Sequence, residues 1–394
     1  MIRKNKIAVI SGRYIFHNPY RELVLIDKLR KKNFDVSLFL PSVSHYPKGY
    51  SKNITNDKIF KEYNPIIFNN DFDLIKKVKK SNLLLVGSDF KYSRFIILLR
   101  LLGKKVVSYD SAGGMDHKNN FANISCVKSE FYKKFMSRLG KIKIDQKTIR
   151  VTGSILFEDM RLPKLIKSKF KEKYSVNDKT IVFYPKSIFT FRKKLNTWLK
   201  RDKKSIQSVD AHHVYLNEQV CKIIKNMGHT LLVKLHPGLY NSEFVKEELL
   251  FWKNLGANII EPLDTFNMLS YVDLGISLKS QSSLDVNYFR KPFIYLEEGN
   301  ALPPILDHIS DCMLELGPSD SWGKADPIKF HAMPSWVGSL ANLRNLNLKI
   351  NEVLNNDFNK SHYEKYIEHF WFSDDSKASD RIIEQVNILI ERDV

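Results

Sequence analysis

Cysteine is scarce in this sequence, and its arrangement argues against two kinds of scaffold. The 394-residue chain contains three cysteines, Cys126, Cys221 and Cys312, which lie far apart. This spacing matches neither a zinc cluster nor a disulfide framework, and it is typical of a protein from a reducing cytoplasm. Long apolar runs are also missing: no window approaches ~20 uninterrupted apolar residues, so no membrane-spanning helix is predicted. Residues 2–11 enter a strand directly, without the apolar stretch of a secretion signal.

Acidic residues are few relative to basic ones. Asp and Glu number 43 against 63 Lys and Arg, which gives a net charge of +20. Such an excess suits nucleic acid, an anionic membrane surface or an anionic substrate, and it also occurs on basic surfaces that have no specific partner. Nucleic acid ranks last, because the chain has no zinc-knuckle spacing, helix-turn-helix pattern or aromatic RNA-binding signature. We expect a cytoplasmic protein, with peripheral contact at the anionic inner face of the cytoplasmic membrane as an option.

The sequence does contain regularly alternating strand and helix patterns. A hydrophobic content of 43% and an aromatic content of 12% are those of a globular protein, and 394 residues fit two domains. Short apolar runs alternate with helical patterns in both halves, which predicts an α/β protein with two Rossmann-like lobes, parallel sheets and a cleft between the lobes. The predicted organisation is an N-terminal lobe at 1–160, a linker at 161–179, a C-terminal lobe at 180–360 and a helical segment at 361–394 that packs back on the lobes.

Two polar motifs follow predicted strands in the C-terminal lobe. Lys234-Leu235-His236-Pro237 comes after an apolar strand that begins at Thr230, and Ser280-Gln281-Ser282-Ser283 comes after a strand that ends near Ser277. The carboxyl ends of parallel strands meet at one edge of a sheet, where ligands bind in open α/β folds. An ammonium, an imidazole and hydroxyls are suited to phosphate oxygens without a metal. The motifs therefore predict a nucleotide phosphate site, the alternative being a strand-capping His and a Ser-rich loop.

A candidate general base follows a strand of the N-terminal lobe. The strand at 105–109 leads into Asp110, and Gly113 and Gly114 beyond it permit close approach of a backbone or ligand. An Asp facing the cleft is placed to accept a proton from an acceptor hydroxyl. The alternative is that Asp110 caps a turn or helix. Asp116 and His117 are further candidates for the base.

Weaker signals complete the set of candidate site residues. Lys186 follows the first strand of the C-terminal lobe and is predicted to reach the donor, and Arg13 and His17 follow the first strand of the chain, where we place acceptor binding together with Gly113. Asn70-Asp71-Phe72-Asp73 contains an Asp-x-Asp element, but it precedes an amphipathic helix. We interpret Asn70 as a helix N-cap followed by an acidic first turn, not as part of a metal site.

The motif order resembles that of known glycosyltransferases. The Tyr109-Asp110-x-x-Gly113 element, the His-Pro element and the later serine pair are similar to those of bacterial sialyltransferases and polysialyltransferases, Kdo transferases and CDP-glycerol glycerophosphotransferases, which have the GT-B fold. The resemblance implies a metal-independent glycosyltransferase that moves sialic acid, Kdo or a related ulosonate from a CMP-sugar to a surface-polysaccharide or lipopolysaccharide acceptor. It implies that Asp110 is the base and that the donor phosphate is held by His236, Pro237, Ser282 and Ser283. The N-terminal lobe is then the acceptor side and the C-terminal lobe the donor side.

Three alternatives stay open at this stage. A UDP-sugar donor fits the same lobe, with Asp285 or Glu297-Glu298 on the ribose. A non-catalytic glycan-binding assembly protein with a degenerate transferase fold would bind no nucleotide. An epimerase of similar architecture would need a denser set of acidic and His residues than the sequence places in the cleft. Inversion and retention at the transferred sugar are both compatible with the residues present.

The segment 91–105 is strongly apolar and flanked by cations. One interpretation is a helix that lies on an anionic bilayer. The preferred interpretation is an ordinary helix of a βαβ unit, because a strand follows it immediately.

Overall fold

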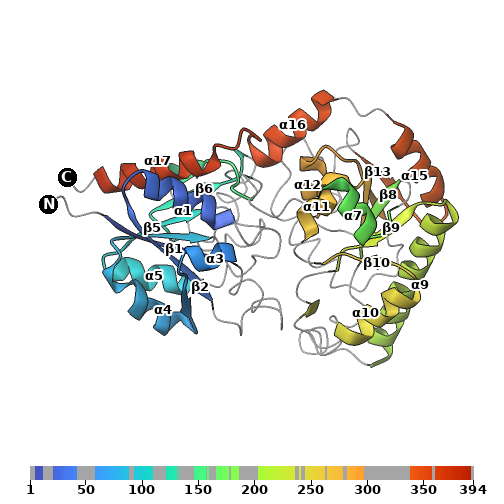
Figure 1. Cartoon of the computed structure of the whole chain (residues 1–394), viewed down its shortest axis with the longest axis horizontal. Coiled ribbons are helices and arrows are strands. Elements are labelled where there is room, and N and C mark those ends of the chain that lie inside the picture. Colours follow the sequence, from blue (N-terminus) through green and yellow to red (C-terminus); the bar gives the residue numbers. More distant parts are fainter. Residues whose placement is uncertain are drawn as a thin grey trace. The chain divides into compact units, whose positions relative to one another are not determined.

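The computed structural model describes residues 5–11, 21–41, 58–87, 93–109, 121–130, 133, 146–156, 158, 166–176, 179–185, 203–235, 239–240, 245–261, 264–277, 282–296, 338–356 and 360–391. The chain divides into two compact units (Figure 1). Unit 1 comprises Met1–Leu162 together with Ile367–Val394, and unit 2 comprises Pro163–Tyr366. Each unit is built around one parallel sheet, which confirms the predicted α/β class with two Rossmann-like units.

Unit 1 contains a seven-stranded parallel sheet in the order β3-β2-β1-β4-β5-β6-β7. Its core strands are short and almost wholly apolar, as expected for strands that are covered on both faces. The strand order reverses between β1 and β4, and such a switch point is where ligands enter open α/β sheets. The strands are β1 (Lys6–Ile10), β2 (Asp35–Pro41), β3 (Ile66–Phe68), β4 (Leu83–Gly87), β5 (Lys105–Tyr109), β6 (Ile124–Val127) and β7 (Ile149–Val151).

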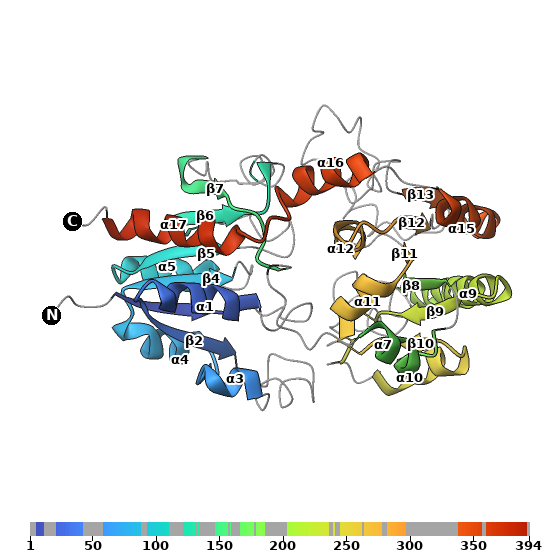
Figure 2. The same ribbon diagram turned by 45° about the horizontal axis from the view of Figure 1, so that its top comes forward.

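Helices cover both faces of the unit 1 sheet (Figures 1 and 2). On one face, α4 (Asp71–Lys77) and α5 (Ser93–Leu101) bury Leu74, Phe95 and Leu99 in a single apolar cluster with the strands. On the other face lie α1 (Arg21–Lys31) and α17 (Ala378–Glu391), which contact each other. The predicted N-cap is confirmed, because the Asn70 side chain accepts a 3.0 Å hydrogen bond from the backbone N–H of Asp73.

A buried carboxylate fastens the C-terminal helix to unit 1. Glu158 accepts hydrogen bonds from the backbone N–H of Ser379 at 2.7 Å, from the Ser379 hydroxyl at 2.6 Å and from Lys28 Nζ at 2.7 Å. Lys28 also donates to Asp380 at 2.7 Å. Partial burial alone would lower the pKa of Lys28, but the hydrogen bonds to Asp380 and Glu158 outweigh it and raise that pKa. The last helix is therefore part of the first unit, although the second unit precedes it in sequence.

Unit 2 contains a six-stranded parallel sheet in the order β10-β9-β8-β11-β12-β13. Its main apolar cluster joins one face of the sheet to α9, α10 and α15 through buried side chains such as Val220, Trp252 and Ile350. The strands are β8 (Thr180–Tyr184), β9 (Thr230–Val233), β10 (Asn258–Ile259), β11 (Leu274–Ser277), β12 (Phe293–Leu296) and β13 (Gly338–Ala341). The helices are α7 (Lys167–Lys173), α9 (Lys203–Asn226), α10 (Val245–Asn254), α11 (Thr265–Tyr271), α12 (Ser282–Tyr288), α15 (Leu346–Asn355) and α16 (Lys360–Trp371), the last of which enters unit 1 at Ile367.

The opposite face of this sheet is covered closely by α12, which packs against β11 and β12. Gly275 on β11 makes this approach possible. A Cβ atom at this position would lie 2.5 Å from the ring of Phe293 and 3.1 Å from Val286 of α12. The missing side chain lets the helix and the Phe293 ring meet over the strand, which holds α12 near the carboxyl end of β11.

Candidate functional site

Three neighbouring strands of unit 2 end in polar side chains at one edge of the sheet. Tyr184 is the last residue of β8, Ser277 is the last residue of β11, and the two are register partners. Lys234 directly follows β9, and its backbone N–H continues the ladder by donating to the carbonyl of Phe183 at 3.0 Å. Because side chains alternate between the faces of a strand, Lys234, Tyr184 and Ser277 leave the sheet on the same face. We call these three residues the polar row.

The polar row is buried and largely without hydrogen-bond partners. Lys234 is 4% exposed, and within the described part of the chain its ammonium donates only to the carbonyl of Leu235 at 3.1 Å. The buried hydroxyls of Tyr184 and Ser277 have no partner among the described residues. Buried polar groups are nearly always paired, so an unpaired group indicates a missing partner. An ammonium and two hydroxyls donate to oxygen acceptors, and phosphate oxygens are acceptors of this kind.

One carboxylate lies near the polar row. Asp285 on α12 acts electrostatically on both Lys234 and Tyr184. Burial lowers the pKa of Lys234 to about 8, and the negative charge of Asp285 opposes that shift. Burial also raises the pKa of Tyr184 well above its ordinary value, and Asp285 adds to that rise. The tyrosine therefore stays a hydrogen-bond donor, and the lysine keeps its positive charge below about pH 8, where it can attract an anion.

Of the predicted donor-site residues, Lys234 lies in this polar row. Ser282 and Ser283 are the first two residues of α12, the helix that comes after Ser277 in the sequence. The other predicted site residues lie outside the described part of the chain; they are Arg13, His17, Asp110, Gly113, Lys186, His236, Pro237 and Ser280, together with the further base candidates Asp116 and His117. Glu297 and Glu298 also lie outside it. Their roles stay predictions.

Two members of the row, Tyr184 and Ser277, are absent from the residues predicted from the sequence. The sequence places both residues inside strands, so their hydroxyl groups are not among the predicted site groups. The signal that could identify them is position: each is the polar last residue of a buried strand and follows an apolar residue whose side chain lies on the other face. Once the neighbouring strands are known, this places both beside Lys234.

A second buried polar cluster lies at the carboxyl edge of the unit 1 sheet. Arg21 and Glu22 open α1 and form an ion pair at 2.7 Å, with side chains only 5% and 2% exposed. The Tyr109 hydroxyl lies 3.4 Å from both Glu22 Oε1 and the carbonyl oxygen of Ile10. Glu22 Oε2 is buried and has no hydrogen-bond partner among the described residues. The cluster includes Tyr109, the last residue of β5, which immediately precedes the predicted base Asp110 in sequence.

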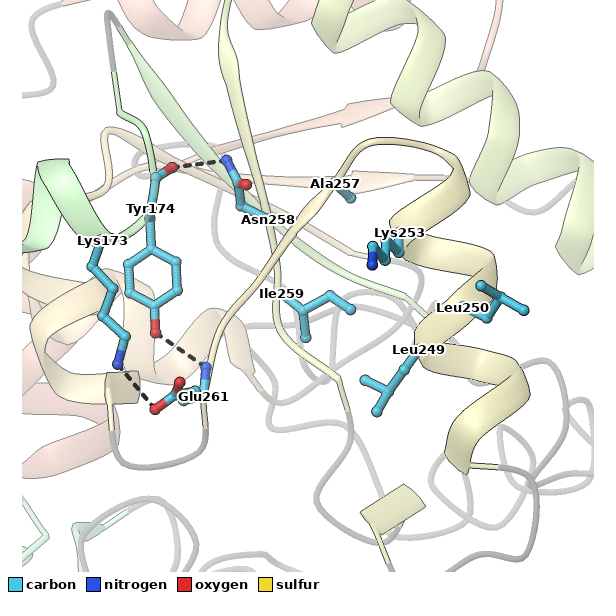
Figure 3. A pocket seen from close by; sticks show the side chains of 9 residues that line it. All are labelled: Lys173, Tyr174, Leu249, Leu250, Lys253, Ala257, Asn258, Ile259 and Glu261. Carbon is cyan, nitrogen blue, oxygen red and sulfur yellow. Dashed lines mark hydrogen bonds and ion pairs between the residues drawn. The ribbon is translucent and has the colours of Figure 1, made fainter.

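A pocket of about 560 Å³ lies beside the edge strand β10 (Figure 3). Its polar wall is already satisfied, because Lys173 pairs with Glu261 at 2.9 Å and with Asp264 at 2.7 Å. The Tyr174 hydroxyl donates to Asp264 at 2.5 Å. The other wall presents Leu249 and nearby apolar side chains. Because Lys173, Tyr174 and Glu261 are already paired and most of the remaining lining is apolar, the polar row remains the stronger candidate.

The described residues contain neither a metal cluster nor a membrane-spanning helix. No group of three or more His, Cys, Asp or Glu side chains among them is arranged to hold a metal ion. In the same part of the chain, no helix combines the length and the apolar character needed to cross a membrane.

Comparisons with known proteins support the fold. No family model matches the sequence, and no curated protein matches it either. Solved structures do match over nearly the whole chain. MnaA of S. aureus, determined with UDP, is 13% identical with a TM-score of 0.60 and covers 99% of this chain and 97% of its own.

Two further structures agree. The UDP-GlcNAc 2-epimerase of Methanocaldococcus jannaschii, in complex with UDP-GlcNAc and UDP, is 16% identical with a TM-score of 0.58, covering 97% of this chain and 99% of its own. HepE of Anabaena, in complex with UDP and glucose, is 12% identical with a TM-score of 0.53, covering 98% and 100%. This protein therefore has the GT-B fold. The narrower resemblance to sialyltransferases and Kdo transferases is not confirmed.

Proposed function

We propose that this protein is a nucleotide-sugar enzyme that binds the phosphates of a UDP-sugar at the polar row of unit 2. The observation that carries the proposal is the placement of Lys234, Tyr184 and Ser277 on one sheet edge, where they are buried and short of acceptors among the described residues. UDP is preferred to the CMP-sugar implied by the motif resemblance, because structures of the same fold were determined with UDP. The alternative of a UDP-sugar donor is thus the better supported one.

The reaction we favour is glycosyl transfer. Breaking the bond between the anomeric carbon and the phosphate oxygen leaves negative charge on the departing diphosphate. Donors aimed at that charge stabilise the transition state more than the bound substrate, which accelerates the reaction. Lys234, Tyr184 and Ser277 supply such donors without a metal, and we assign His236, Ser282 and Ser283 to the same task.

The acceptor side is assigned to unit 1. Asp110 takes the proton from the attacking hydroxyl of the acceptor, which we place near Arg13, His17 and Gly113. The class of acceptor we propose is a surface polysaccharide or a lipid-linked glycan, in keeping with the net charge of +20.

Epimerisation of a UDP-sugar is the second candidate. It is favoured by the UDP-GlcNAc 2-epimerase of M. jannaschii, whose structure covers 97% of this chain. Inverting carbon 2 requires its C–H bond to break and re-form, so this reaction needs a group in the site that removes and returns a proton. The buried Glu22, one oxygen of which has no partner among the described residues, adds to the acidic groups of unit 1. The polar row serves the phosphates in both reactions.

A thermal-shift panel of UDP, CDP, CMP and GDP tests the proposal. We expect UDP to raise the melting temperature most and Lys234→Met to abolish that rise. Lys173→Met, beside the β10 pocket, is the matched control and should keep it. A larger rise with CMP would favour the CMP-sugar alternative, and no response to any nucleotide would favour the non-catalytic glycan-binding protein.

The reaction itself is tested by following UDP-N-acetylglucosamine by proton NMR with the wild-type protein. Release of UDP with free sugar or a glycosylated acceptor supports transfer, and a new nucleotide sugar epimeric at carbon 2 supports epimerisation. In either reaction Asp110→Ala should lower the rate by ~100-fold or more if Asp110 is the base.

A further inference from the structure

Helix α5 of unit 1 is apolar on both sides. Phe95, Ile96 and Leu99 are buried against the sheet, as expected for a helix of a βαβ unit. Leu98 and Leu101 on the helix and Leu102 directly after it, however, are 40%, 79% and 55% exposed. Their spacing of i, i+3 and i+4 places all three along one stripe. Single exposed leucines are common on soluble proteins, whereas a continuous stripe of them indicates a contact surface.

Cations border this stripe. Lys104 Nζ donates to the carbonyl oxygens of Lys79 at 2.7 Å and Ser81 at 2.8 Å, which fixes the short helix η2 (Val78–Lys80) beside the end of α5. Lys79 and Lys80 are exposed there. Arg100 lies between the leucines in sequence and is also exposed, its guanidinium donating to the carbonyl of Phe121 at 2.9 Å. We call the six residues Lys79, Lys80, Leu98, Arg100, Leu101 and Leu102 the α5 surface.

The neighbouring helix α4 also exposes an apolar and a cationic side chain. Phe72 is 77% exposed and is followed one turn later by the exposed Lys76. The adjacent Asp73 is neutralised by Lys77 at 2.8 Å. Figures 1 and 2 show α4 and α5 on the same side of the unit 1 sheet, where both contribute to one apolar cluster. Exposed apolar and cationic side chains thus occur on both helices.

We propose that the α5 surface docks unit 1 on an anionic lipid bilayer. Exposed leucines bordered by lysines match the two parts of such a bilayer, because the leucines enter the acyl boundary while the cations meet the anionic headgroups. Charge complementarity favours lipid over a second copy of this basic chain, since two positively charged surfaces would repel each other. Docking here would bring a lipid-linked glycan within reach of unit 1, but the proposal stands independently of nucleotide binding.

Vesicle co-sedimentation tests this docking, with vesicles of phosphatidylcholine alone or mixed with phosphatidylglycerol. The wild-type chain should sediment with the anionic vesicles only, and added salt should weaken binding. Leu98→Gln/Leu101→Gln/Leu102→Gln should lower the partition coefficient on the order of 100-fold. Lys79→Ala/Lys80→Ala should lower it about 30-fold, about five-fold for each lysine. The control Leu250→Gln/Leu348→Gln changes leucines of unit 2 that are 56% and 65% exposed and should bind as wild type.

Several results would overturn the docking proposal, and each can be told apart from the others. Equal sedimentation of the wild type and the triple glutamine variant, or no binding of the wild type to anionic vesicles, overturns the proposal. A dimer in lipid-free sedimentation velocity that the triple variant abolishes would assign the surface to a second copy of the chain and would also overturn it. Melting followed by circular dichroism verifies that the variants are folded. A positive UDP shift without vesicle binding would defeat this proposal alone, and the reverse result would defeat only the proposed function.

Discussion

The hydroxyl of Tyr109, at the end of β5, lies 3.4 Å from Oε1 of Glu22, at the start of α1. The strand β4 runs between β5 and β1, and its last residue, Gly87, is the register partner of Tyr109. With no side chain on Gly87, the tyrosine can extend across the end of β4. The contact joins the beginning of the first helix to the strand end that leads into Asp110.

Single and double substitutions in the buried ion pair of Arg21 and Glu22 should affect stability differently. Arg21→Met leaves Glu22 charged and without its cation, and we expect the free energy of unfolding in urea to fall by about 3 kcal/mol. The double variant Arg21→Met/Glu22→Met should recover most of that loss, because no unpaired charge then remains. Lys6→Met, which breaks the exposed pair with Asp35, is the control and should cost less than about 1 kcal/mol. A double variant no more stable than Arg21→Met would show that this ion pair does not dominate the site.

UDP affinity should depend on pH through Lys234. Burial lowers the pKa of this lysine to about 8 in the free protein. Its cationic form, which attracts phosphate, is therefore lost as the pH rises through 8, whereas an unperturbed lysine would keep its charge. We expect calorimetry to show roughly a 5–10-fold loss of affinity between about pH 7.5 and about pH 9, where the phosphates stay ionised. Lys234→Met should bind weakly with a flat pH profile, and an equally steep profile in that variant would assign the dependence to another group.

The same lysine should affect stability in the opposite direction. Between about pH 8 and its ordinary pKa of 10.5, the unfolded chain binds more protons at this position than the folded chain. Stability therefore rises with pH across this interval as far as Lys234 is concerned. Urea unfolding of the wild type and Lys234→Met at several pH values measures this contribution, and identical pH profiles for both proteins would contradict it.

Ser277→Ala should separate stability from binding. The Ser277 hydroxyl is buried without a partner among the described residues, so its removal should leave the melting temperature of the free protein unchanged or raise it. Loss of a phosphate donor should still weaken UDP binding about five- to ten-fold. Ser125 is the matched control, because its hydroxyl bonds that of Ser108 at 3.2 Å in unit 1. Ser125→Ala should destabilise the protein by about 1 kcal/mol without affecting UDP binding. Lower stability and unaltered binding for Ser277→Ala would remove this residue from the site.

Glu158 should be among the most sensitive structural positions of unit 1. Glu158→Ala leaves the Ser379 N–H and hydroxyl and the Lys28 ammonium without their shared acceptor, and we expect a loss of about 3 kcal/mol in urea. Glu130→Ala is the control, since Glu130 is exposed and 3.5 Å from Lys133, and it should change stability by less than about 1 kcal/mol. Limited proteolysis should release α17 first in the Glu158 variant. Cleavage elsewhere would show that Glu158 does not anchor that helix.

Several elements could be predicted almost to the residue. Compact apolar runs in the sequence predict strands at 105–109, 180–184, 274–277 and 293–296, and the structure has buried strands at these same residues. The strands Ile124–Val127 and Gly338–Ala341 were missed. Ser and Cys interrupt the first, Gly and Ser open the second, and neither carries a distinctive pattern. They are strands because β5 and β12 offer them hydrogen-bonding edges.

Helix α9 shows a different limit. The sequence predicts a helix at 215–227, but the helix spans Lys203–Asn226. Its first half is rich in Lys, Ser and Gln and has only a weak apolar pattern, so the sequence alone does not predict a helix there. Propagation of a helix costs little once its apolar half is packed against a sheet, so the polar half can extend it without a pattern of its own.

By itself the sequence determined the α/β class, the parallel strands and the polar residues that end them, because burial on both faces of a sheet demands apolar runs and permits polar groups only at their ends. It did not determine which ends are neighbours. Lys234, Tyr184 and Ser277 form a row only because β9, β8 and β11 lie side by side, in an order unrelated to their order along the chain. Strand order depends on long-range hydrogen bonding and on how the helices pack, so only the tertiary structure could bring these three donors together.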